Sequence, residues 1–212
     1  MLKKAITVLL TVAVFGSMPL LAGCGKSSTA RASEKKEQVK QLMRSSGNWG
    51  EINTLLQASV ADNPKDPEAQ FLLGVSFYNL RNYPAALDHL QTDLELDAGN
   101  VQARLIIGNV YRDMNQIDKA ETAYRDLIKR APDFAQTYLN LARMLEQEKR
   151  PKDALAVLED GASRAQGTEV LLELGERYRT AGQTEKARAV YQKVLREDPE
   201  HQQAKDALAK LK

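Results

Sequence analysis

A pattern that recurs every 33 or 34 residues constrains this chain more than any other feature of its sequence. In each of four copies, a small residue is followed twelve positions later by an alanine. The small residues are Gly74, Gly108, Ala142 and Gly175, and the alanines are Ala86, Ala120, Ala154 and Ala187. A period of this length is typical of solenoids, in which each repeat buries its apolar face against its neighbours.

Apolar residues keep the same register in every copy. They stand directly before the small residue at Leu73, Ile107, Leu141 and Leu174, and four positions after the alanine at Leu90, Tyr124, Leu158 and Tyr191. A spacing of four places two side chains on the same face of a helix, and a small residue lets two helices approach closely. The sequence therefore predicts about eleven packed helices and no strand.

This pattern resembles the tetratricopeptide repeat (TPR), in which Leu-Gly, Tyr, Ala, Phe and Pro occur in this order. The resemblance implies an all-α, right-handed superhelical solenoid of helix-turn-helix pairs. The complete repeats that it implies are residues 67–100, 101–134, 135–167 and 168–200. Residues 201–212 have a polar, alanine-rich helical pattern, and we expect them to form the C-terminal capping helix that covers the last repeat.

A degenerate TPR helix pair is expected before these copies, at residues 34–66. Its second helix, at about residues 48–63, keeps the apolar register. The first helix is expected from Glu34 to Arg44. It departs from the pattern because Lys40 stands where the other copies have a small residue.

The N-terminal segment has the composition of a bacterial secretory signal, with two lysines followed by a long apolar run. It closes with Leu-Ala-Gly-Cys, which resembles the lipobox of bacterial lipoproteins. The resemblance implies that residues 1–23 are removed and that Cys24 receives acyl chains, which anchor the protein to a membrane. Residues 24–33 are then the lipidated cysteine and a flexible tether.

The residue after the lipobox cysteine bears on localisation. Gly25 stands there, whereas an Asp would favour retention in the inner membrane of enteric bacteria. We therefore expect the periplasmic face of the outer membrane in a Gram-negative source, and otherwise the outer face of the cytoplasmic membrane.

Charge and composition argue against several classes of function. The chain has 30 Lys and Arg against 28 Asp and Glu, and removal of Lys3 and Lys4 with the signal leaves 28 of each. A neutral exported chain gives no reason to expect nucleic acid as a partner. The two histidines, His89 and His201, are too scattered for a metal cluster. We therefore expect no cofactor, no small-molecule substrate and no enzymatic activity.

The concave surface of the solenoid is where a partner is expected. In TPR proteins the first helix of each repeat lines this surface, and the resemblance carries nine partner-binding positions onto this chain. They are Phe71, Val75, Tyr78, Asn79, Leu105, Asn109, Arg112, Asn140 and Arg143.

Two interpretations stay open for the apolar end of this surface. The residues concerned are Phe71, Leu72, Val75, Leu105 and Ile106. They either pack against the preceding degenerate repeat or form an exposed patch for an amphipathic or extended partner segment.

The polar end argues against one known mode of binding. Asn109 and Asn140 stand where TPR proteins that bind chaperone carboxyl termini place two asparagines. However, Leu105 replaces an expected lysine, and Glu169 and Glu173 occupy cationic positions of the next repeat. Carboxylates at these positions would repel a terminal carboxylate, so a carboxylate clamp is disfavoured.

These features together predict a membrane-anchored TPR scaffold or assembly factor of the bacterial cell envelope. Its partners would be envelope proteins or peptide segments. The chain resembles lipoproteins that pilot secretin or type IV pilus assembly, and also lipoproteins that recruit cell-wall enzymes. A self-associating structural protein is the alternative from another class.

Overall fold

The computed structural model describes residues 26–45, 47–165 and 167–211. Within these ranges the chain forms eleven α-helices and no strand, as the repeat pattern predicts. Cys24 and the expected signal peptide lie outside the described residues. In the described part of the chain, no helix has both the length and the apolar composition to cross a membrane.

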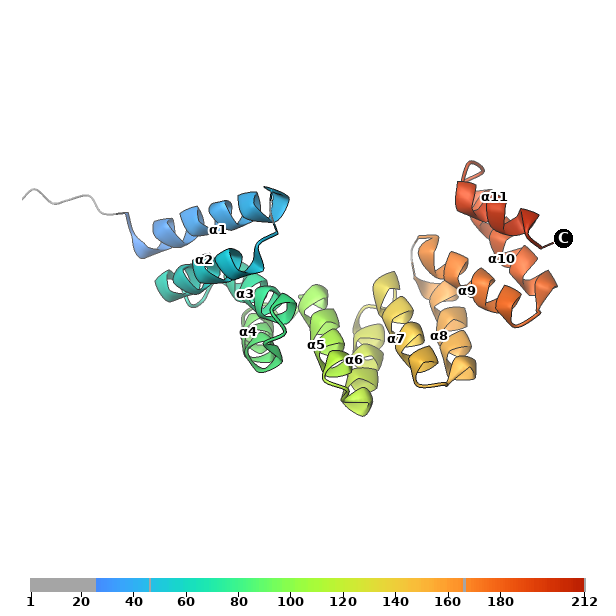
Figure 1. Ribbon diagram of the computed structural model, residues 1–212, viewed down its shortest axis with the longest axis horizontal. Coiled ribbons are helices and arrows are strands. Elements are labelled where there is room, and N and C mark those ends of the chain that lie inside the picture. The colour runs from blue at the N-terminus through green and yellow to red at the C-terminus, as the bar shows by residue number, and fades with distance from the viewer. Residues whose placement is uncertain (1–25, 46, 166, 212) are drawn as a thin grey trace, which may run out of the picture.

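The helices follow one another as packed pairs in a curved row (Figure 1). Each first helix packs on the second helix of its own repeat, and each pair packs on the next pair. The helices are α1 (Ser28–Ser45), α2 (Trp49–Asp62), α3 (Pro67–Asn79), α4 (Tyr83–Leu96), α5 (Val101–Asp113), α6 (Ile117–Arg130), α7 (Ala135–Gln147), α8 (Pro151–Arg164), α9 (Glu169–Thr180), α10 (Thr184–Glu197) and α11 (Gln202–Ala209).

The helix boundaries repeat with the period of the sequence. The helices α2, α4, α6 and α8 begin at residues 49, 83, 117 and 151, each 34 residues after the one before. The first four second helices therefore share one register, and this includes the degenerate pair at the N-terminus.

Asx side chains define the start of several helices. Asp66 accepts a hydrogen bond from the backbone N–H of Ala69 at 3.1 Å, and Asn100 accepts one from Ala103 at 3.1 Å. Such a cap satisfies one of the backbone donors that a helix leaves unpaired at its N-terminus. Pro67 follows Asp66 at the first helical position, where its missing N–H costs nothing.

The turn inside each repeat requires one residue in the left-handed region. This residue recurs in every pair, as Gly47, Arg81, Asn115, Lys149 and Gly182, with φ between 58° and 70°. Glycine adopts this conformation without steric cost, whereas the β-carbon of Arg or Lys opposes it. Two of the five turns therefore carry residues that are poorly suited to their backbone.

The small residues permit close packing of the paired helices, as the sequence predicts. A β-carbon added at Gly108 would lie 2.5 Å from Cε1 of Tyr124, and one added at Gly175 would lie 2.5 Å from Cε1 of Tyr191. Both rings are buried. These glycines are therefore required by the approach of the second helix.

Many of the buried side chains belong to one long core and two smaller ones. The long core extends from Leu105 to Leu211 and joins the helices from α5 to the C-terminus. One smaller core consists of Val39, Ile52, Leu56 and Leu73, and the other of Leu171, Val194 and Ala204. At the C-terminus, α11 packs on α10 and buries Ala204, so it covers the last complete repeat as expected of a capping helix.

The first helix is longer than the sequence predicts. It begins at Ser28, so residues 28–33, which were expected to belong to a flexible tether, are helical and that expectation is wrong for them. Two contacts explain the extension. Ala32 is buried, with its carbonyl accepting a hydrogen bond from Oγ of Ser59 at 3.0 Å, and Arg31 pairs with Asp62 at 3.0 Å.

Lys40 does not break the first repeat, although a small residue is expected at its position. Its ammonium group reaches Glu68 at 3.1 Å and Glu37 at 3.2 Å, while the neighbouring Val39 is fully buried. Hydrogen bonds and charges of these two carboxylates raise the pKa of Lys40. The lysine thus lies toward α3, and the apolar contact with α2 is made beside it.

Candidate functional site: the concave face

The first helices form a continuous layer along the solenoid. The helix α5 contacts α3 on one side and α7 on the other, and α7 also contacts α9. We call the positions of this layer at which the TPR resemblance predicts partner contacts the concave face. They are Phe71, Val75, Tyr78, Asn79, Leu105, Ile106, Asn109, Arg112, Asp113, Asn140, Arg143, Glu146, Gln147, Glu173, Glu176 and Arg179.

At the apolar end of the concave face, some of the predicted residues pack against the core and others remain partly exposed. Leu72 packs against the small core around Ile52 and Leu56, so it has a structural role. Phe71, Val75 and Ile106 are only partly buried. These three residues form the apolar strip, which is the part of the concave face with unassigned apolar surface.

Leu105 is predicted to contact a partner, but its side chain is buried. Its side chain is 5% exposed and belongs to the long core. The next residue of the helix, Ile106, remains partly exposed. The structure thus gives Leu105 a packing role and leaves little of its surface for a partner.

The two asparagines form a hydrogen-bond network between neighbouring repeats. Asn140 donates from Nδ2 to Oδ1 of Asn109 at 2.9 Å, and the hydroxyl of Tyr124 donates to the same oxygen at 2.7 Å. Oδ1 of Asn140 accepts from Gln136 at 2.9 Å. Asn140 is 5% exposed, so its amide holds α5 and α7 together. Within the described residues, Nδ2 of Asn109 has no protein partner and Asn109 is partly exposed.

Tyr78 and Arg112 meet at the aspartate between them. The hydroxyl of Tyr78 donates to Oδ2 of Asp113 at 2.8 Å, and Arg112 pairs with Oδ1 of Asp113 at 2.8 Å. Burial, followed by this hydrogen bond, raises the pKa of Tyr78 to about 12. Tyr78 thus stays neutral at physiological pH and joins α3 to α5, while Asn79 beside it is exposed.

Ion pairs fill the C-terminal end of the concave face. Arg177 pairs with Glu146 at 2.6 Å, which joins α9 to α7, and it also pairs with Glu173. Hydrogen bonding to Arg179 lowers the pKa of Glu176, and burial raises the pKa of Glu146. The acids of this end are therefore neutralised within the protein.

Arg143 differs from the other cations of the concave face. It is exposed, and no hydrogen bond or ion pair joins its guanidinium to another residue in the described part of the chain. Arg112 and Arg179, in contrast, are each paired with a carboxylate. Arg143 is therefore available to an external anion.

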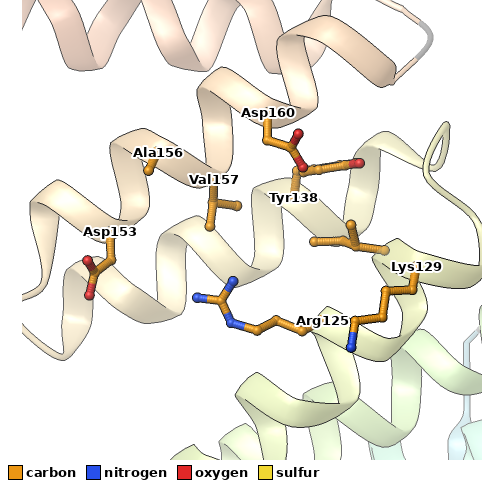
Figure 2. A pocket seen from close by; sticks show the side chains of 8 residues that line it. Arg125, Lys129, Tyr138, Asp153, Ala156, Val157 and Asp160 are labelled. Atoms are coloured by element: carbon orange, nitrogen blue, oxygen red, sulfur yellow. The ribbon is translucent and has the colours of Figure 1, made fainter.

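A hollow lies between the second helices α6 and α8, and it is lined by none of the concave-face residues. Figure 2 shows Arg125 and Lys129 of α6 on one side and Asp153 and Asp160 of α8 on the other, with Tyr138 between them. The hollow has a volume of 290 Å³. Three of its charged groups are already used, since Arg125 pairs with Glu121, Asp153 with Arg150 and Asp160 with Arg164. The sequence pattern did not single out these residues, because each reads as an ordinary residue of a solvated helix.

The histidines have separate local roles. His89 stacks on Phe77 with ring centroids 5.4 Å apart, and its Nδ1 lies 2.8 Å from Oε1 of Gln70. Burial lowers its pKa. His201 precedes α11 as its N-cap residue. In the described part of the chain, no group of three His, Cys, Asp or Glu side chains could hold a metal ion.

Comparison with protein families agrees with this architecture. Two family models described as tetratricopeptide repeat match residues 107–167 and 145–211. A third, described as anaphase-promoting complex, cyclosome, subunit 3, matches residues 54–127. A comparison with curated protein sequences found no match.

Solved structures with the same fold come from several bacteria. TTC0263, a TPR protein of Thermus thermophilus, matches with a TM-score of 0.57 and 20% identity, over 85% of this chain and 98% of its own. MamA of Desulfovibrio magneticus RS-1 matches with a TM-score of 0.60 and 17% identity, over 81% and 97%. PilF of Pseudomonas aeruginosa matches with a TM-score of 0.63 and 16% identity, over 88% and 79%. At these identities the similarity establishes the fold.

Proposed function

Because this chain contains tetratricopeptide repeats, we propose that it is a protein-interaction scaffold, anchored to a membrane of the bacterial cell envelope through a lipidated Cys24. It holds a partner protein on the concave face and so assists assembly of an envelope complex. The partner is an envelope protein or a segment of one, and the anchor keeps the scaffold at the periplasmic face of the outer membrane in a Gram-negative cell.

One observation carries the interaction role. The side chains of the apolar strip, Phe71, Val75 and Ile106, remain partly exposed, although Leu72 and Leu105 beside them pack in the cores. Exposed apolar side chains that lie together mark sites of protein interaction, and a few central anchors supply most of the affinity of an interface. The repeat fold supplies the rigid layer that holds them in place.

The sequence supports the membrane anchor. The segment that ends at Cys24 resembles a lipobox, and Cys24 is the one cysteine of the chain. A lipobox joined to a TPR array resembles lipoproteins that pilot secretin or type IV pilus assembly. We propose a piloting role ahead of recruitment of cell-wall enzymes, because a lipid anchor and a repeat array that spans nearly the whole chain are the parts that such a role needs.

Partner capture tests the interaction role. Phe71→Ala combined with Tyr78→Ala should abolish capture of envelope proteins in cells by crosslinking and mass spectrometry. Leu80→Ala combined with Leu96→Ala is the matched control, since these side chains are 45% and 40% exposed and lie off the concave face. Circular dichroism should show the same helicity in both variants. Capture that survives the first pair of changes would show that another surface binds the partner.

Acylation and fractionation test the anchor. Incorporation of labelled palmitate into the wild-type chain, and its loss in Cys24→Ser, is expected. The wild-type protein should sediment with outer membranes. Recovery in the inner membrane fraction would overturn the proposed location, and recovery without label would overturn the proposed lipidation.

A further inference from the structure

The side chains of the concave face also indicate which kind of peptide segment it binds. This inference rests on the proposed function. We infer that the concave face binds an extended peptide segment with two large apolar side chains about three residues apart and a carboxylate side chain about three residues further along. The apolar side chains contact the apolar strip, and the carboxylate pairs with Arg143.

The apolar half of this pattern follows from which apolar side chains of the concave face remain partly exposed. Leu72 and Leu105, the neighbours of the strip in sequence, are packed against the cores. Phe71 and Val75 lie four positions apart on α3, which places them on one face of the helix, and Ile106 lies on the next first helix. The strip therefore offers two places for apolar side chains, one on α3 and one on α5.

The charged half follows from how the ion pairs are distributed. The acids of the concave face from α5 to α9 each have a partner in the protein. Asp113 has Arg112 and Tyr78, Glu146 and Glu173 share Arg177, and Glu176 has Arg179. Arg143 is an exposed concave-face cation that no ion pair joins to a carboxylate in the described part of the chain, although its charge acts on Glu146 nearby. A partner that neutralises it must bring an acidic group.

The spacing follows from helix packing. Adjacent packed helices lie roughly 8 to 10 Å apart, and an extended chain advances about 3.3 Å per residue. A segment that crosses from α3 to α5 and then to α7 therefore uses about three residues for each helix. The hydrogen bond between Asn109 and Asn140 shows that side chains of α5 and α7 meet along this path. The unpartnered Nδ2 of Asn109 lies between the two ends and can donate to a backbone carbonyl of the segment.

The proposed segment ends at α7 because the arginines of the next helix, Arg177 and Arg179, are already paired with carboxylates of the protein. Glu169 begins α9 and has no ion-pair partner in the described residues, and Glu173 already takes Arg177. A second carboxylate placed there would find no unpaired cation and would meet the charge of Glu169. The preference for an acidic residue is therefore confined to the position opposite Arg143.

Selection from a random peptide library tests this inference without prior choice of a ligand. The full chain in detergent is presented to phage-displayed random dodecapeptides, and enriched sequences are aligned. The wild-type chain should enrich peptides with two Leu, Ile, Phe or Met residues about three apart and an Asp or Glu about three residues from the second, in either chain direction. Arg143→Glu should replace the enriched acid by Lys or Arg while the apolar pair remains.

The controls separate this inference from the proposed function. Lys152→Glu makes the same charge change on α8, where the lysine is exposed, and should leave the wild-type motif unchanged. Ile106→Ser should lose the apolar pair at an unchanged helical circular dichroism spectrum. Enrichment of a motif that neither Arg143→Glu nor Ile106→Ser alters would overturn the inference while keeping the interaction scaffold. No enrichment over a blank surface would overturn the inference, and failure of partner capture in cells would overturn the scaffold itself.

Discussion

Asn140 donates a hydrogen bond from Nδ2 to Oδ1 of Asn109 at 2.9 Å, and this bond joins the first helices of two successive repeats. Tyr124 donates to the same oxygen, so three side chains from α5, α6 and α7 meet at one acceptor. In a solenoid each repeat contacts only its neighbours, so such junctions determine how far unfolding of one repeat spreads to the next. The network thus couples the middle of the concave face to the stability of the array.

Replacement of Asn140 tests this coupling. We expect Asn140→Ala to lower the free energy of unfolding by about 1 to 2 kcal/mol, because it removes two hydrogen bonds of a buried amide. Urea unfolding followed by circular dichroism measures the loss. Gln147→Ala on the same helix is the control, since Gln147 is exposed and should give a change below about 0.5 kcal/mol. Equal stability of Asn140→Ala and the wild type would contradict a structural role for the amide.

The close packing of Gly108 on Tyr124 predicts opposite effects for two glycine substitutions. Gly108→Ala should destabilise the protein by about 1 to 3 kcal/mol, because the added β-carbon lies 2.5 Å from the ring of a fully buried tyrosine. Gly50→Ala in α2 meets only Oδ1 of Asn48, at 3.5 Å. It should leave stability unchanged or raise it by up to about 1 kcal/mol, because alanine favours the helix. Thermal unfolding of the two variants compares them directly, and a stable Gly108→Ala would contradict the packing.

The left-handed turn residues offer a route to higher stability. Lys149 has φ of 58°, and Lys149→Gly should stabilise the protein by about 1 kcal/mol, because glycine removes the steric cost of this conformation. Gly182 has φ of 70° in the equivalent turn and open space around it, so Gly182→Ala should lose a similar amount through backbone strain alone. Differential scanning calorimetry should show a higher melting temperature for Lys149→Gly and a lower one for Gly182→Ala. A destabilised Lys149→Gly would show that the lysine side chain contributes more than its backbone costs.

Asp93 gives the protein a specific pH dependence. The residue is 1% exposed, and burial raises the pKa of its carboxyl group from 3.8 to about 6 although Asn100 hydrogen-bonds to it. The folded state therefore holds this proton more tightly than the unfolded state, and its contribution to stability is full below pH 4 and is lost as the pH rises toward 6. Asp93→Asn should gain about 2 kcal/mol relative to the wild type between pH 4 and pH 7.

Chemical denaturation at both pH values measures this difference. Glu95→Gln is the control for charge, because Glu95 is exposed and lies two residues away. It should show a much smaller pH-dependent difference from the wild type. A constant difference between Asp93→Asn and the wild type across this range would show that the pKa of Asp93 is the same in the folded and unfolded states.

The sequence could predict the repeat architecture because the same residues recur wherever two helices of one repeat meet. Gly108 and Tyr124 lie sixteen positions apart in this pattern, and their contact follows from the period. Contacts between repeats were harder to foresee, because they depend on the rotation between successive pairs. For this reason the burial of Leu105 and the use of Asn140 as a link between helices appear only in the structure.

Two further features had weak signals in the sequence. The early start of α1 depends on Arg31, Ala32 and their contacts with α2. No local sequence motif predicts a helix that begins at Ser28. Asp93 could have been noticed, since it occupies the position at which the other repeats have Ser59, Leu127, Gly161 and Val194. Those residues are neutral, so an acid at this buried position indicates a group with an altered pKa.

Site-specific photocrosslinking in cells tests most directly whether the concave face holds the partner. A photoreactive residue at Val75, on the apolar strip, should form a covalent adduct with an envelope protein. The same residue at Gln91, exposed on the second helix α4, should form none. An adduct at Gln91 and none at Val75 would contradict the central claim, because the partner would then bind to the opposite side of the solenoid.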